Sequence, residues 1–114
     1  MRSWASPLLR FLGLSAGLLT CVVALQAAPA AGGAAVFKQK CSMCHGADGK
    51  GFAAIKTPDF TDPKWQASLK DNGIGEAIKN GKKGTTMPAF GDKLKDEEIQ
   101  ALVGYIRSFG SRKK

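Results

Sequence analysis

The feature that most constrains this chain is the pentapeptide Cys41-Ser42-Met43-Cys44-His45, which holds the single histidine among 114 residues. Two thiols at this spacing can add across the two vinyl groups of a haem, and the following histidine then lies beneath the iron. The pattern therefore predicts one covalent haem c, attached through Cys41 and Cys44, with His45 as the proximal ligand.

Three other uses of a C-x-x-C pair remain open. A thioredoxin-type redox pair normally sits at a strand–helix junction, and no alternation of strands and helices is visible in this sequence. A zinc site needs four ligands, whereas only two cysteines and one histidine lie close together here. A structural disulfide suits an exported domain but gives His45 no function.

A second axial ligand can be sought among the three methionines, Met1, Met43 and Met87. Met1 lies in the leader described below, and Met43 lies between the attachment cysteines on the proximal side. Met87 follows Gly84-Thr85-Thr86 and precedes Pro88, a composition typical of a loop with a stiffened backbone. A thioether ligand favours reduced iron, so we predict metal ligation by His45 and Met87. The alternative for Met87 is a core-filling side chain.

The N-terminal segment has the pattern of a secretory signal peptide. Arg2 and Arg10 precede an apolar stretch over residues 11–25, and Ala28-Pro29-Ala30 supplies small residues for cleavage after Ala30. Cleavage would remove Cys21 and two of the 17 basic residues but none of the nine acids, lowering the net charge from +8 to +6. We predict a signal peptide at 1–30 and export to the bacterial periplasm. The alternative is an uncleaved membrane anchor.

The remaining sequence predicts short helices and no sheet. A short linker is expected at about 31–35, and a first helix from about Gly33 to Cys41, so the two expected segments overlap. A last helix is expected from Asp96, where three acidic residues precede a stripe of apolar residues. Two weaker helices are expected after Asp62-Pro63 and over residues 72–79. Gly104 interrupts the last helix, and we hypothesise that its small size lets another helix approach.

From about Gly33 to Phe109 the chain resembles small bacterial class I cytochromes c. The matching residues are Gly33, Phe37, the motif Cys41–Gly46, Met87-Pro88-Ala89-Phe90, Leu102 and Tyr105. This resemblance implies an all-α class I cytochrome c fold at 31–110, with three to four short helices around one covalent haem and a basic tail at 111–114. The first and last helices should cross, so that Gly33 and Phe37 meet Leu102 and Tyr105.

The resemblance also assigns two further cofactor-binding residues. The carbonyl of Pro58 is expected to orient the proximal imidazole. Trp65 is expected to reach a haem propionate, and its alternative is a plain core aromatic. The family often has Ser or Thr where this chain has Lys95, so the cap of the last helix is expected to differ.

These assignments predict a soluble carrier of single electrons and not an enzyme, because two axial ligands leave no position for a substrate. The predicted haem wall consists of Phe37, Phe52, Ile55, Phe60, Leu69, Ile78, Phe90, Leu94 and Ile99. The alternatives are a haem subunit of a larger dehydrogenase or oxidase complex, or a five-coordinate haem protein that binds gases or reacts with peroxide.

For partners, we expect acidic redox proteins in the membrane or periplasm, no nucleic acid, and a monomeric chain. Six lysines bracket the attachment motif and the methionine loop and are hypothesised to form a basic ring that steers docking: Lys38, Lys40, Lys50, Lys79, Lys82 and Lys83. An ordinary solvated surface is the alternative.

Overall fold

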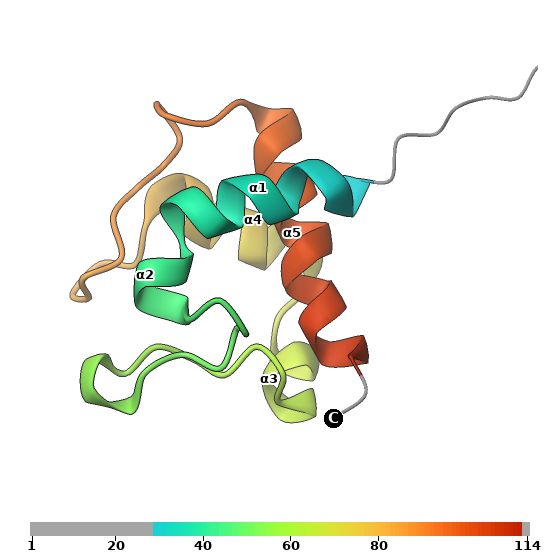
Figure 1. Ribbon diagram of the computed structural model, residues 1–114. Coiled ribbons are helices and arrows are strands. Elements are labelled where there is room, and N and C mark those ends of the chain that lie inside the picture. Colours follow the sequence, from blue (N-terminus) through green and yellow to red (C-terminus); the bar gives the residue numbers. More distant parts are fainter. Residues whose placement is uncertain (1–28, 113–114) are drawn as a thin grey trace, which may run out of the picture.

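The computed structural model describes residues 29–112, and Figure 1 shows their arrangement. Regular structure in this range is entirely helical, without strands, which confirms the predicted all-α fold. The elements are α1 (Pro29–Lys40), α2 (Ser42–His45), the short 3-10 turn η1 (Ala53–Ile55), α3 (Pro63–Ser68), α4 (Asp71–Asn80) and α5 (Asp96–Ser111). Within 29–112, every helix is too short or too polar to cross a bilayer.

Helix α1 starts earlier than the sequence predicted. It runs from Pro29 to Lys40 and includes the residues expected to form a linker at 31–35, so that prediction was wrong. Proline is well tolerated in the first helical turn, and alanine has the highest helix propensity. The predicted leader lies outside the described residues up to position 28, and the boundary expected after Ala30 falls in the first turn of α1.

Helices α1 and α5 cross, as predicted, and Figure 1 shows α1 lying across α5. At the crossing, a Cβ built on Gly33 would lie 2.1 Å from the carbonyl oxygen of Ala101 and 3.0 Å from Cβ of Tyr105. One turn later the rings of Phe37 and Tyr105 are 5.2 Å apart. Leu102 is fully buried in the same apolar cluster. Glycine at position 33 therefore sets how closely the two helices approach.

The hypothesis about Gly104 was wrong. A Cβ at this position would meet no heavy atom of residues 29–112 within 4 Å, so no helix of this range approaches there. The helical stripe of α5 that faces the core is instead formed by larger side chains. The buried residues of α5 are Ile99, Leu102, Val103, Ile106 and Phe109.

The helix termini follow local sequence signals. The Asp62 carboxylate accepts a hydrogen bond from the Lys64 backbone N–H at 3.0 Å and caps α3, as predicted. At α5, the Glu98 carboxylate accepts a hydrogen bond from the Lys95 backbone N–H at 2.8 Å. This contact reaches back from the first turn, so α5 begins without the Ser or Thr common in the family.

Arg107 on α5 ties the last helix to α3 and α4. Its guanidinium donates to Asp71 Oδ1 at 2.7 Å, to the Gln66 backbone carbonyl at 2.5 Å, and to the carbonyl of Leu69. The Gln66 amide in turn donates to the carbonyls of Phe60 and Ile106. This network holds the α3–α4 connection against α5, and two of its residues, Leu69 and Ile106, also line the crevice described below.

Arg107→Ala should destabilise the folded protein by roughly 2–3 kcal/mol, because partly buried carbonyls lose their donors. Chemical denaturation measures this loss. The matched control is Lys79→Ala, which removes the exposed Lys79–Asp96 pair at 3.5 Å and should change stability by about 0.5 kcal/mol or less. Equal effects of the two substitutions would contradict a structural role for the Arg107 network.

Candidate cofactor site

The attachment motif occupies the junction of α1 and α2. The Cys41 N–H donates to the Phe37 carbonyl at 2.9 Å and so continues α1, while the Cys41 carbonyl accepts from the Cys44 and His45 N–H groups at 3.1 and 2.9 Å. Both cysteines carry free thiols. Burial, with a smaller contribution from Cys44, raises the pKa of the Cys41 thiol to about 11. One short turn therefore presents two thiol sulfurs and one imidazole together.

The imidazole of His45 is held by aromatic stacking. Its ring lies 4.7 Å from the ring of Phe60, with an interplanar angle of 18°. Phe60 is buried and contacts Trp65, 4.6 Å away between ring centroids, and Phe109. The sequence placed Phe60 only among the wall residues. Its stacking on His45 could not be predicted, because no local pattern links positions 45 and 60.

One nitrogen of His45 lacks a partner. Its Nδ1 is buried and makes no hydrogen bond with any of residues 29–112. Burial also lowers the pKa of His45, so the ring is neutral at pH 7 and has a lone pair available for a metal. Buried polar atoms are normally paired, so the unpartnered Nδ1 is expected to gain a hydrogen bond when the cofactor is bound, and the other ring nitrogen is the one available to a metal.

The segment after α4 turns back onto that helix and carries Met87. Gly81 ends α4 with φ at +71°, and a Cβ there would lie 2.8 Å from the Met87 carbonyl oxygen. Further along, the Phe90 and Gly91 N–H groups donate to the Ile78 and Lys79 carbonyls, each at 3.0 Å. These bonds pair the last carbonyls of α4, which would otherwise be unsatisfied, and they fix the return of the chain.

A turn closed by Thr85 sets the backbone of Met87. The Thr85 hydroxyl donates to the Lys82 carbonyl at 2.7 Å and accepts from the Met87 N–H at 3.2 Å. The Lys82 N–H donates to the Met87 carbonyl at 3.2 Å. Met87 is thus held on both sides of its peptide backbone, within a segment that sequence alone identified only as a loop.

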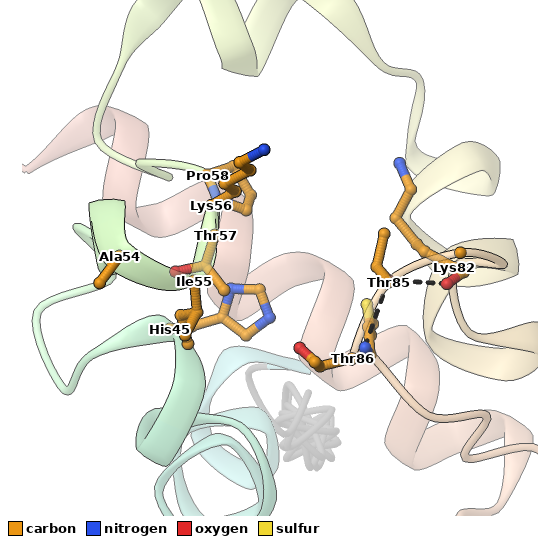
Figure 2. A pocket seen from close by; sticks show the side chains of 11 residues that line it. His45, Ala54, Ile55, Lys56, Thr57, Pro58, Lys82, Thr85 and Thr86 are labelled. Atoms are coloured by element: carbon orange, nitrogen blue, oxygen red, sulfur yellow. Dashed lines mark hydrogen bonds between the residues drawn. The ribbon is translucent and has the colours of Figure 1, made fainter.

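Between the His45 and Met87 walls lies a crevice with two connected parts, of about 410 and 320 Å³. Figure 2 shows His45 on one side of it and Thr85 and Thr86 on the other. Both volumes fall in the range typical of small-molecule and cofactor sites. Six residues line both parts: His45, Lys56, Pro58, Lys82, Thr85 and Met87.

The structure corrects the predicted wall. Ile55, Phe60 and Leu69 line the crevice. Five of the other predicted residues, Phe37, Ile78, Phe90, Leu94 and Ile99, belong to the core cluster or pack against it, outside the lining, while Phe52 is 48% exposed. The lining includes several side chains that were not predicted, among them Thr57, Ile74, Ala77, Thr86 and Ile106. Which wall residues face the crevice depends on helix rotation, which apolar periodicity does not determine.

The two residues assigned by resemblance also lie at the crevice. Pro58 lines both parts of the crevice. Half-buried Trp65 lines the part of about 320 Å³, called the inner part below, where it contacts Phe60. Contacts of Pro58 with His45 Nδ1, and of Trp65 with a propionate, stay predictions.

The competing uses of the motif fit this geometry less well. Residues 29–112 contain no strand for a thioredoxin-like junction and no cluster of three or more metal-ligating His, Cys, Asp or Glu side chains. A haem fits better: the crevice has apolar walls, a neutral imidazole with an orphaned nitrogen on one side and a methionine on the other.

Comparisons with known proteins also indicate a c-type cytochrome. Residues 28–106 match the family described as cytochrome c oxidase, cbb3-type, subunit III. The FixP subunit of a cbb3-type oxidase from Bradyrhizobium sp. (strain ORS 278) is 36% identical over 84 residues, which are 74% of this chain and 29% of that protein. The CcoP subunit from Rubrivivax gelatinosus is 40% identical over 68 residues, 60% of this chain and 22% of that protein.

Among solved structures, the KustC0563 c-type cytochrome aligns with a TM-score of 0.63 at 36% identity, covering 68% of this chain and 95% of that one. Cytochrome cL from Hyphomicrobium denitrificans aligns with a TM-score of 0.59 at 27% identity, covering 69% of this chain and 46% of that one. The chain spans less than a third of the FixP and CcoP proteins, so their further activities do not transfer with the domain. The chain belongs to the family of cytochrome c oxidase, cbb3-type, subunit III, and is a small class I cytochrome c with one covalently attached haem c.

Proposed function

We propose that this domain transfers single electrons as the haem c unit of a membrane-bound oxidase complex of the cbb3 type. The observation that carries the proposal is that His45 and Met87 line the same crevice, with His45 on one side and Thr85 and Thr86, which directly precede Met87, on the other (Figure 2). The similarity to FixP and CcoP subunits supports an oxidase as the partner more than it supports a freely diffusing carrier.

The residues of the site have separate functions in this proposal. Cys41 and Cys44 hold the group covalently, and His45 and Met87 are the metal ligands. When bound, haem c supplies an iron that accepts and releases one electron. His45 Nδ1 has no hydrogen-bond partner among residues 29–112; with haem c bound, the Pro58 carbonyl would accept its proton, and Trp65, which also lines the crevice, would donate to a propionate.

Electron transfer is favoured when the ligands stay in place in both oxidation states. Phe60 stacks on His45, and the Thr85 turn and the bonds to α4 restrain Met87, so neither ligand needs to move. With both axial positions occupied by the chain, no position remains for a substrate. The domain by itself is therefore proposed to carry electrons without catalysing a reaction.

A freely diffusing periplasmic carrier is the second candidate. It is favoured by the KustC0563 c-type cytochrome, of which this chain covers 95%. In either case the predicted leader at 1–30 would export the chain to the periplasm, where acidic docking faces would attract its basic surface. Of the six lysines in the predicted ring, Lys82 lines the crevice and Lys79 pairs with Asp96, and the ring itself stays a prediction.

The test uses the full chain, produced in a host that attaches haem c. Mass spectrometry should give one covalent haem and report the fate of the leader. The oxidised protein should show the far-red sulfur–iron charge-transfer band. Absence of that band, with ready carbon monoxide binding to the reduced form, would overturn ligation by Met87. Copurification with an oxidase complex, against a single monomeric species in sedimentation, distinguishes the two candidate functions.

Thr85→Val should weaken the hold on Met87, because the valine side chain can neither accept from the Met87 N–H nor donate to the Lys82 carbonyl. A hydrogen bond of this kind contributes about 0.5–1.5 kcal/mol, so competing ligands such as azide should bind the oxidised protein roughly 2- to 10-fold more tightly. Thr85→Ser should behave like the natural protein. Thr86→Val, which alters the neighbouring crevice residue, is the matched control, and an equal gain there would contradict the assignment.

A further inference from the structure

The charged side chains that line the crevice are all cationic. Lys56 and Lys82 line both of its parts, and no Asp or Glu among residues 29–112 does so. The two lysines come from opposite walls, as Figure 2 shows: Lys56 lies with Pro58 near His45, and Lys82 lies near Thr85. The sequence predicted Lys82 as part of a docking ring, and no pattern in it indicated a function for Lys56.

The backbone of Lys56 adopts an unusual conformation. Its φ of 55° and ψ of 33° are left-handed, and it is the only non-glycine residue of the described range with positive φ. This conformation is costly for a residue with a Cβ, and glycine adopts it readily. Nearby turns use Gly49 and Gly51 for positive φ. A lysine in this position is unfavourable for the turn itself, so its side chain requires another explanation.

Within residues 29–112, neither ammonium group forms an ion pair with a carboxylate. The ion pairs within residues 29–112 are Lys79–Asp96 and Arg107–Asp71, and they involve neither Lys56 nor Lys82. Two unpaired cations on opposite walls of one apolar crevice favour a ligand that carries two negative charges at one end.

We infer that Lys56 and Lys82 bind the two propionate carboxylates of haem c, one from each wall. This inference rests on the proposed function and extends it. Trp65, which lines the inner part of the crevice with both lysines, would lie at the same end of the group. Reduction adds one electron to the site, and a nearby cation stabilises the more negative state. The two lysines therefore raise the reduction potential as well as orient the cofactor.

The experiment measures the midpoint potential of the isolated holoprotein by spectroelectrochemical titration. Lys56→Gln and Lys82→Gln should each lower the potential, and the double variant should lower it further. Lys83→Gln is the matched control, because Lys83 is exposed like Lys56 and Lys82 and is adjacent to Lys82 in sequence, but is absent from the crevice lining. High salt should reduce the small shift of the control most, because a lysine in direct contact with a carboxylate is screened less than a more distant charge.

Two further variants separate charge from structure. Lys56→Arg should retain the natural potential, since it keeps the charge. Lys56→Gly should raise stability to denaturant by relieving the backbone while still lowering the potential. Shifts no larger than that of Lys83→Gln, or an arginine variant that matches the glutamine variant, would overturn the inference. A holoprotein that contains no haem would instead overturn the proposed function itself.

A surface used only for docking gives a different result. Lysines that act only on an acidic partner would change the salt dependence of electron exchange with that partner. The potential of the isolated domain would then be the same in the crevice and control variants, which is the outcome that contradicts propionate binding.

Discussion

Met87→Ala should lower the reduction potential of the holoprotein and open the iron to external ligands. Methionine opposite histidine raises the potential of a haem, and axial ligands set haem potentials over a range of about 0.8 V. We therefore expect a fall on the order of tenths of a volt. The far-red band of the oxidised form should disappear, and the reduced form should bind carbon monoxide.

The matched control is Met43→Ala. Met43 lies within the attachment motif but its side chain is 89% exposed and lies outside the crevice lining. It should leave the potential, the far-red band and the resistance to carbon monoxide unchanged. If Met87→Ala also leaves all three unchanged, the sulfur of Met87 does not bind the iron, and the five-coordinate alternative becomes the better description.

Gly33→Ala should destabilise the protein by roughly 2 kcal/mol. The added Cβ would lie 2.1 Å from the Ala101 carbonyl oxygen, a backbone atom that cannot rotate away. Overpacking costs about 1–3 kcal/mol and sometimes more, which exceeds the gain of about 1 kcal/mol in helix propensity. For a domain of this size the melting temperature should fall by about 10 °C.

Gly104→Ala is the opposite test on the same pair of helices. No atom of the described residues lies within 4 Å of its added Cβ, so only the propensity gain of about 1 kcal/mol remains, and stability should rise. Thermal and denaturant unfolding measure the change in stability of each variant relative to the natural holoprotein. This change should be negative for Gly33→Ala and positive for Gly104→Ala. A stable Gly33→Ala variant would mean that α1 and α5 can separate without loss, against the crossing described above.

Several features followed from sequence because their causes are local. Cys41, Cys44 and His45 lie within about one helical turn, so their spacing can be recognised from the sequence alone. Asp62 before Pro63 is a cap that acts over two residues, and the structure shows its bond to the Lys64 N–H. Met87 could be selected because the alternatives in a chain with three methionines were few.

Other features depended on how distant segments meet. Both Gly33 and Gly104 are helical glycines, and only the crossing point shows that Gly33 faces Ala101 while Gly104 faces open space. Phe60 stacks on His45 across 15 positions, and no periodic pattern connects them. Residues 31–35, predicted as a linker, are helical and belong to α1, which packs across α5.

Sequence by itself indicated a covalent haem c and an all-helical fold, and it supplied the predicted ligands His45 and Met87. Bond spacing and capping act within a few residues, so they can be read along the chain. Tertiary structure alone decided which walls face the crevice, that the Thr85 hydroxyl holds Met87, and that Lys56 and Lys82 stand on opposite sides. These features depend on how each helix is rotated and on the path of the loop after α4. Both are determined by packing between segments that lie far apart in the chain.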